Sequence, residues 1–200
     1  ERGRAFGAEL VGGDLACTRG PLAVAVTGIG TWTGAGRPPT RSGARAGDLV
    51  FATGPCGGSR LGRHLALAPR VAEARWLAAH GARALMDVSD GLALDLSRLA
   101  RASRVRIDLA AVPVHADARR AARASGRTAR EHALYDGEDH ELLACVPRAR
   151  VDALLAEAPR RCPGLAYVGA VRAGRGLWLC DVGRARRFAP GRGRGWIHGS

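Results

Sequence analysis

From residue 48 onward, short apolar stretches alternate with stretches in which apolar residues recur at helical spacing. Strands and helices that alternate along a chain favour an α/β domain, in which helices are layered around one sheet. The predicted strands cover residues 48–53, 83–88, 105–109, 142–146, 165–171 and 176–180. The predicted helices cover residues 60–68, the stretch after Pro69, and residues 92–99, 116–124, 128–134 and 150–156.

The residues before this alternation have a different character. A Gly-Gly-Asp turn at residues 12–14 precedes a strand-like run at residues 21–32, in which alternating residues such as Val24 and Val26 suit one buried face. Residues 34–47 are rich in Gly, Pro and Arg, which indicates a linker. We therefore expect a domain boundary in this linker.

The composition is that of a globular protein, with 46% hydrophobic and 24% charged residues in a chain of 200. No apolar run approaches the roughly 20 residues that a membrane span needs, and the first residues lack the apolar region of a signal peptide. The five Cys form no Cys-x-x-Cys pair, so we expect reduced thiols. These features predict a cytoplasmic protein without a membrane partner.

A net charge of +13 would ordinarily indicate nucleic-acid binding. The chain has no Lys, however, and its Arg residues are scattered from Arg2 to Arg194 without forming a basic stripe. Only three Phe and two Tyr are available to stack on bases. We therefore predict no nucleic-acid partner, and a basic RNA-binding module remains an alternative.

A group of oxygen ligands lies at the end of the predicted strand 83–88, in the sequence Met-Asp-Val-Ser-Asp-Gly. The two-residue period of a strand places Asp87 and Ser89 on one face, while Asp90 enters the turn before the helix. Two carboxylates and a hydroxyl beside backbone N–H groups suit Mg²⁺ that carries the phosphates of a nucleotide. The alternative is that Ser89 or Asp90 only caps the helix, which leaves Asp87 without a role.

Three further segments are compatible with a site. Residues 136–141, Asp-Gly-Glu-Asp-His-Glu, offer five polar groups before the strand at 142–146, although a solvated turn would also explain them. In Gly12–Asp14 the glycines would let the backbone approach a phosphate, but such turns are common. The Gly-rich residues 54–59 lack the Lys of a P-loop, so they are predicted to form a strand-to-helix turn.

Five segments, taken in order, resemble the motifs of a known family. They are Gly12–Asp14, Thr40–Ala44, Asp87–Leu92, Gly137–Leu142 and Gly195–His198. Together they resemble thiamine-monophosphate kinases, of the PurM-like (aminoimidazole-ribonucleotide synthetase) superfamily, over nearly the whole chain. The specific part is the pair Ser-Asp-Gly-Leu and Gly-Glu-Asp-x-Glu-Leu. The resemblance implies an α/β (α+β layered) fold, a PurM-like C-terminal domain with a mixed sheet and helices.

The resemblance also implies a domain organisation. Residues 1–45 would be a remnant of the N-terminal ATP-binding domain, and residues 46–200 would be the C-terminal domain. The family's N-terminal segment, with an acidic magnesium-binding motif of its own, is not represented in this sequence. Because its barrel partners would be missing, we expect the first part to pack poorly and to leave Val24 and Val26 exposed. The N-terminal domain forms the dimer interface in this superfamily, so the full-length protein is expected to be a homodimer.

Residues that match the family's motifs are expected to bind Mg²⁺, ATP or thiamine monophosphate. The matching residues are Asp14, Asp87 and Asp90 for Mg²⁺, Gly13, Arg41 and Ser89 for ATP, and Glu138 and Trp196 for thiamine monophosphate. Such a kinase transfers the γ-phosphoryl group of ATP directly to the substrate's phosphate and forms thiamine diphosphate. Positioning and charge neutralisation dominate this chemistry, so no residue is expected to act as a catalytic nucleophile.

The sequence departs from the family pattern at three places. Leu15–Cys17 separate the Gly-Gly-Asp turn from Thr18, Asp136 stands where Gly is usual, and His140 stands where Tyr or Phe is usual. The last two changes alter the packing expected around the substrate but keep Glu138. Because the family's N-terminal segment is not represented in this sequence, a non-catalytic fragment that retains the fold is a second alternative.

Overall fold

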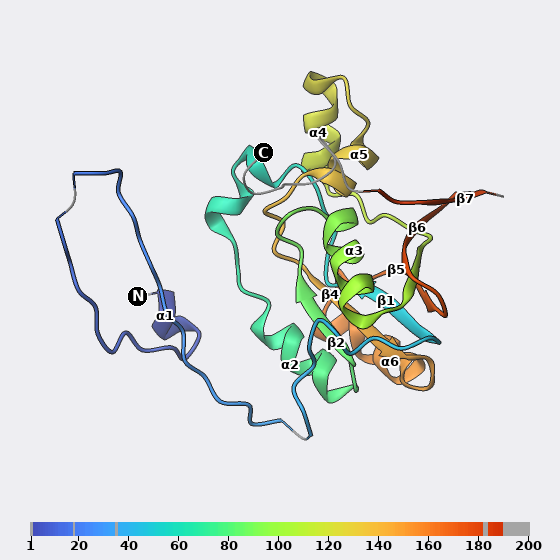
Figure 1. The fold of residues 1–200 in the computed structure, drawn as a ribbon, viewed down its shortest axis with the longest axis horizontal. Coiled ribbons are helices and arrows are strands. Elements are labelled where there is room, and N and C mark those ends of the chain that lie inside the picture. The colour runs from blue at the N-terminus through green and yellow to red at the C-terminus, as the bar shows by residue number, and fades with distance from the viewer. Residues whose placement is uncertain (1, 18, 35, 182–183, 190–200) are drawn as a thin grey trace. The chain divides into compact units, whose positions relative to one another are not determined.

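The computed structural model describes residues 2–17, 19–34, 36–181 and 184–189. The chain consists of two units, Glu1–Thr33 and Gly34–Ser200, and each is described by itself. The described residues of the smaller unit contain one short helix, α1 (Arg2–Ala5), and otherwise no helix or strand (Figure 1). The domain boundary at residue 45 stays a prediction.

The strand predicted at residues 21–32 is wrong. Its backbone forms no ladder with another strand of the described chain. The predicted exposure of Val24 and Val26 is confirmed, because these side chains are 78% and 88% exposed. Alternating apolar residues favour an extended chain, but a strand also needs a neighbour that satisfies its N–H and C=O groups.

The larger unit contains a mixed sheet, as predicted. Its described strands are β1 (Asp48–Ala52), β2 (Ala84–Asp87), β3 (Arg106–Leu109), β4 (Leu142–Pro147), β5 (Ala166–Arg172), β6 (Gly176–Asp181) and β7 (Arg184–Arg187). They lie in the order β2-β4-β1-β5-β3-β6-β7. Only β3 and β6 pair in parallel, and the other neighbours pair antiparallel. The predicted α/β fold class is thus confirmed.

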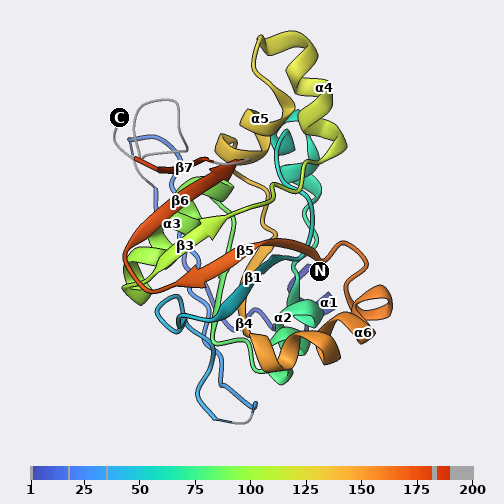
Figure 2. The same ribbon diagram turned by 90° about the vertical axis from the view of Figure 1, so that its right-hand side faces the viewer.

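Helices cover both faces of this sheet. The described helices of the larger unit are α2 (Val71–Ala79), α3 (Leu92–Ser103), α4 (Ala116–Ser125), α5 (Ala129–Tyr135) and α6 (Val151–Arg161), of which α4 and α5 pack mainly against each other. α3 packs against β3 and β6, whereas α2 and α6 lie together beside β4 (Figure 2). None of the described helices is long and apolar enough to cross a membrane.

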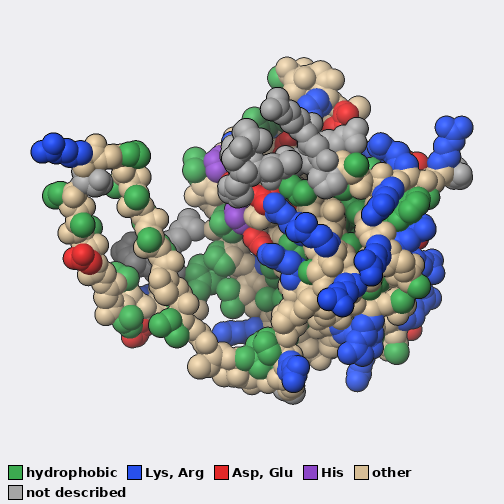
Figure 3. Space-filling model, in the orientation of Figure 1, with side chains coloured by type: hydrophobic (Ala, Val, Ile, Leu, Met, Phe, Trp, Pro, Cys, Tyr) green, Lys and Arg blue, Asp and Glu red, His purple; other side chains and the backbone are tan. Residues whose placement is uncertain are grey.

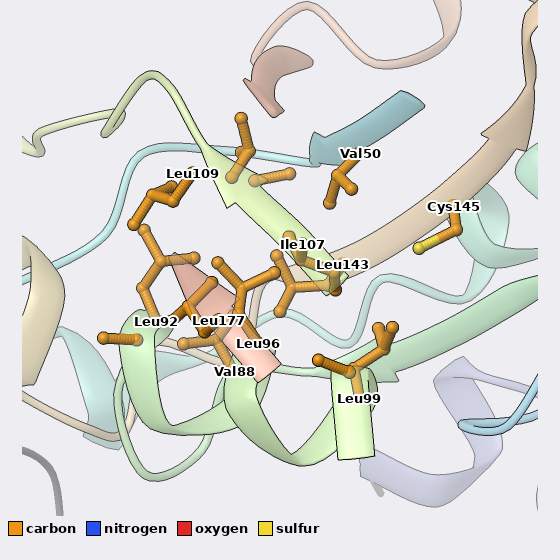
Figure 4. Close-up of a cluster of buried hydrophobic side chains, with 14 of the residues drawn as sticks. Val50, Val88, Leu92, Leu96, Leu99, Ile107, Leu109, Leu143, Cys145 and Leu177 are labelled. Atoms are coloured by element: carbon orange, nitrogen blue, oxygen red, sulfur yellow. The ribbon is translucent and has the colours of Figure 1, made fainter. Parts of the chain in front are cut away.

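The period of the strands divides the core into two clusters. In β4, Leu143 and Cys145 face α3 and join its Leu92 and Leu96 in the larger cluster (Figure 4). Their neighbour Ala144 points the other way, into a cluster that includes side chains of α2 and α6. Burial on both faces explains why this strand reads as a continuous apolar run and not as an alternation of apolar and polar residues.

Most predicted elements of the larger unit are present within a few residues, but three differ. Residues 60–68 form two 3-10 turns, η1 (Ser59–Leu61) and η2 (Arg63–Ala66), because Gly62 at φ 122° interrupts the helix. α6 continues beyond residue 156 with Pro159 inside it. β7 was not predicted, because its residues are mostly Arg and all exposed.

The acidic residues 136–141 hold the glycine-rich loop after β1. Both carboxylate oxygens of Asp139 lie 2.9 Å from the backbone N of Gly57, and Oδ2 of Asp136 accepts from the backbone N of Gly58 at 3.1 Å. Both amides therefore donate to side chains of the protein and not to a phosphate. The predicted turn at residues 54–59 is confirmed, except that it leads into a 3-10 turn.

Glycine is required in this loop because the backbone of other elements approaches it closely. A Cβ on Gly57 would lie 2.5 Å from the backbone N of Ala133, and one on Gly58 would lie 2.4 Å from the carbonyl carbon of Asp117. Both glycines also have positive φ, at 95° and 72°. The loop is thus clamped between α4 and α5 and the acidic segment.

Burial makes the Asp139 carboxylate a source of pH-dependent stability. Desolvation raises its pKa to about 6, against the hydrogen bond from Gly57 and the ion pair with Arg63. The folded protein therefore binds this proton more tightly than the unfolded chain does. This contribution is fully present below about pH 4 and is lost as the pH rises through 6.

We predict that Asp139→Asn removes this pH dependence. The amide oxygen can still accept from Gly57, but the side chain no longer ionises. Relative to the variant, the parent should lose up to about 3 kcal/mol of unfolding free energy between pH 4 and pH 7. Urea unfolding over this range measures the difference. Asp152→Asn, at an exposed position in α6, is the control and should follow the parent; equal pH profiles for all three proteins would contradict the assignment.

Candidate functional site

The two specific motifs of the sequence lie side by side. Beyond the paired residues of β2 and β4, the backbone N of Val88 donates to the carbonyl of Glu141 at 2.8 Å, and the N of His140 donates to the carbonyl of Val88 at 2.8 Å. The N of Glu138 donates to the carbonyl of Ser89 at 2.7 Å. The Ser-Asp-Gly turn and the Gly-Glu-Asp segment are therefore joined by their main chains, and their side chains emerge at one end of the sheet.

This junction requires unusual backbone geometry. A Cβ on Gly137 would lie 2.4 Å from the carbonyl oxygen of Ser89, so only glycine fits there. Glu138 and His140 have φ of 64° and 52°, in the left-handed region that side chains other than those of Gly, Asn and Asp seldom adopt. Each residue of this kind is unfavourable by roughly 1–2 kcal/mol. The hydrogen bonds to Val88 and Ser89 stabilise this conformation.

A buried carboxylate holds the turn before α3. Asp95 is fully buried, and its Oδ2 accepts from the backbone N of Ser89 at 3.0 Å and of Asp90 at 2.9 Å. Its Oδ1 accepts from Nη1 of Arg98 at 2.9 Å, and the same nitrogen contacts the Asp90 carboxylate. Burial raises the pKa of Asp95, against the effects of these bonds.

The structure decides between capping and other roles for this turn. Gly91 occupies the N-cap position of α3, and no side chain caps the helix there. The alternative that Ser89 or Asp90 caps α3 is therefore wrong. The roles of Asp95 and Arg98 were not predicted from the sequence. The available signal was a carboxylate between Leu94 and Leu96, inside the apolar part of a helix, where only a bonded charge is tolerated.

Three titratable side chains lie at the exposed rim of the site. Nε2 of His140 is 3.2 Å from Oε2 of Glu138, and its Nδ1 is 3.7 Å from Oδ2 of Asp87. The side chains of Asp87 and Glu138 are about half exposed, at 48% and 52%. Among the described residues, no group of three or more His, Cys, Asp or Glu is arranged to hold a metal. Asp87 and Asp90 nevertheless offer the carboxylate oxygens that Mg²⁺ prefers.

A cavity of about 260 Å³ lies beside Glu138 and His140. Part of its wall is a second buried carboxylate, Glu141, which accepts from Oγ1 of Thr53 and from Nη2 of Arg70, each at 2.6 Å. The hydrogen bond with Glu141 raises the pKa of Arg70. Glu141 is thus held by its bonds to Thr53 and Arg70, and Glu138 is the more accessible acid of this segment.

The remaining predicted site residues are placed as follows. Gly13 and Asp14 belong to the smaller unit, and the structure does not determine their position relative to Asp87. Arg41 lies before β1, where its carbonyl accepts from Oγ of Ser103 at 3.0 Å. Trp196 lies outside the described residues. Of the eight predicted site residues, the structure therefore brings together four, which are Asp87, Ser89, Asp90 and Glu138.

This chain is similar in sequence and in fold to known proteins. A thiamine-monophosphate kinase of Rhodopirellula baltica is 39% identical over 203 residues, covering 100% of this chain and 62% of that protein. The solved structure of AaThiL complexed with AMPPCP and TMP superposes with a TM-score of 0.57 at 28% identity, over 80% of this chain and 54% of that one. Escherichia coli HypE, a hydrogenase maturation protein, has a TM-score of 0.61 over 77% of this chain and 52% of that one, and at 21% identity it shows only the shared fold.

The chain spans about three fifths of the length of the Rhodopirellula relative. The predicted resemblance to thiamine-monophosphate kinases is confirmed by these matches. Residues 41–179 match the family described as AIR synthase related protein, C-terminal domain. This match covers both joined motifs and every strand from β1 to β5. The chain therefore belongs to the AIR synthase related protein family and contains its C-terminal domain.

Proposed function

We propose that the protein phosphorylates thiamine monophosphate with ATP and Mg²⁺ and forms thiamine diphosphate. The observation that carries this proposal is the main-chain junction between Ser89 and Glu138, with its 2.7 Å hydrogen bond. It brings a turn suited to a metal-bound nucleotide beside an accessible acid at a cavity. The similarity to the Rhodopirellula kinase and to AaThiL supports the same reaction.

The acid beside the cavity suits the proposed substrate. Thiamine monophosphate carries a positively charged thiazolium ring, and the half-exposed carboxylate of Glu138 can pair with it. Glu141 and Asp139 are less suited, because both are buried and already bonded to Arg70 and Arg63. We therefore assign substrate binding to Glu138, together with Trp196.

Asp87 and Asp90 would hold Mg²⁺, together with Asp14. When bound, Mg²⁺ supplies positive charge that neutralises the phosphates. Ser89, Gly13 and Arg41 would contact ATP. Asp95 and Arg98 position this turn, because the buried carboxylate holds the amides of Ser89 and Asp90 while the guanidinium contacts the Asp90 side chain. We further propose a homodimer without a nucleic-acid partner.

We predict that Asp90→Asn lowers the kcat/KM of phosphorylation at least about tenfold, equivalent to about 1.4 kcal/mol of barrier. The substitution removes a metal-binding charge but cannot remove a cap, because Gly91 is the N-cap of α3. Arg98 loses its contact with the Asp90 charge but keeps its ion pair with Asp95, so the melting temperature should stay within a few degrees of the parent's. Thiamine diphosphate formation across a Mg²⁺ titration measures the effect, and the loss should be larger at limiting Mg²⁺. Asp152→Asn removes the same charge from an exposed position and should react at the parent rate.

We also predict that Glu138→Gln raises the KM for thiamine monophosphate about fivefold and leaves the KM for ATP within about twofold. The lost ion pair is worth about 1 kcal/mol at such a half-exposed position. Steady-state kinetics with each substrate varied in turn test this. An equal rise in both KM values would contradict the assignment of Glu138 to substrate binding. A parent protein that forms no thiamine diphosphate would refute the proposed function.

A further inference from the structure

A second and larger cavity, of about 510 Å³, lies between the last turns of α3, the start of β6 and the end of β7. It shares no lining residue with the cavity beside Glu138. At 1.5 Å of rise per residue, its Arg104 lies roughly 20 Å along the helix from Asp90. This cavity is therefore distinct from the cavity beside Glu138.

Four arginines line this cavity, and none of its described lining residues is acidic. They are Arg101, Arg104, Arg175 and Arg187, all exposed. None of the four forms an ion pair with another described residue, in contrast to Arg63 or Arg98. Figure 3 shows that basic side chains gather on the side of the larger unit where Figure 1 shows α3, β6 and β7. A concave site with four uncompensated cations favours an anion.

The floor of the cavity is apolar. Ala100, Leu177 and Phe188 are all buried, at no more than 5% exposed, and Phe188 stacks on the ring of Tyr135 at 6.4 Å. Cavities of this size, with apolar floors and a few polar groups at the rim, are typical of small-molecule sites. The floor suits a flat hydrocarbon ring better than a fully hydrated inorganic ion.

Two backbone features keep arginine side chains at the rim. Gly176 has φ of 83°, and the guanidinium of Arg187 lies 3.3–3.5 Å from the point where a Cβ of Gly176 would stand. Arg104 is the C-cap of α3 in the left-handed conformation, at φ 56°, where Gly is the usual residue. Gly176 thus leaves room for the Arg187 side chain, and Arg104 stands at a position that Gly would favour.

We propose that this cavity binds a small organic anion, an aromatic ring that carries a phosphate or sulfonate group. The ring packs on the apolar floor, and the anionic oxygens accept from the guanidinium forks at the rim, which match such planar or tetrahedral anions. The C-terminal end of α3 carries about half a negative charge, which disfavours an anion. The four full positive charges of the arginines outweigh this effect. This proposal does not depend on the proposed kinase activity.

The probe for the test is 1-naphthyl phosphate, with inorganic phosphate and 1-naphthol as its two halves. By isothermal titration calorimetry, the full probe should bind at least about tenfold more tightly than either half. The variant Arg101→Gln/Arg104→Gln should lose at least about tenfold in affinity. Its matched control, Arg119→Gln/Arg123→Gln, removes two exposed charges from α4 and should change the affinity less than about twofold.

The single variant Arg104→Gly separates binding from folding. It should melt no lower than the parent, because Gly is favoured at this left-handed position, and yet bind the probe several-fold more weakly. Equal losses in the α3 and α4 pairs, or inorganic phosphate binding as tightly as the full probe, would overturn the proposal. Displacement of the probe by a single-stranded oligonucleotide at concentrations below that of the probe would also overturn the proposal, in favour of an extended surface that binds polyanions.

Discussion

The backbone hydrogen bonds between residues 88–89 and residues 138–141 are the constraint on which the rest of the site depends. They extend the pairing of β2 with β4 and fix the Ser-Asp-Gly turn against the Gly-Glu-Asp segment. Gly137 leaves the space that this approach needs. Once the segment is held, Asp139 reaches the loop after β1 and Glu141 reaches Thr53. The segment at residues 137–141 thus holds two loops from distant parts of the sequence, the Ser-Asp-Gly turn and the loop after β1.

Three buried carboxylates around this junction are each paired with an arginine. The pairs are Asp95 with Arg98, Asp139 with Arg63, and Glu141 with Arg70. Each carboxylate also accepts from a backbone amide or a hydroxyl, so its lone pairs are used. A buried charge that loses its partner is strongly destabilising, typically by about 3–5 kcal/mol. Two of the pairs join the acidic segment to other elements, Asp139 to Arg63 of η2 and Glu141 to Arg70 at the start of α2, and the third lies within α3.

Much of the larger unit could be predicted from its sequence because both kinds of periodicity are strong there. β4 and α3 are apolar at the positions that their periods require, and both lie where predicted. Residues 21–32 show the same alternation but form no strand, because alternation cannot supply a partner. The contact of Ser89 with Glu138 could not be predicted, since strand order and register are set by tertiary packing. Asp95 had a signal in the sequence, a carboxylate inside the apolar part of a helix, but the backbone amides that it binds became visible only in the folded chain.

β7 has a consequence for how this protein behaves in concentrated solution. It is the last strand of the described sheet, and one side of its backbone has no described neighbour to pair with. Such an edge can recruit a strand from another molecule and start aggregation. In β7 three of the four residues are Arg, and all four are exposed. Guanidinium groups stay charged at any physiological pH, so mutual repulsion discourages edge-to-edge association until high salt screens it.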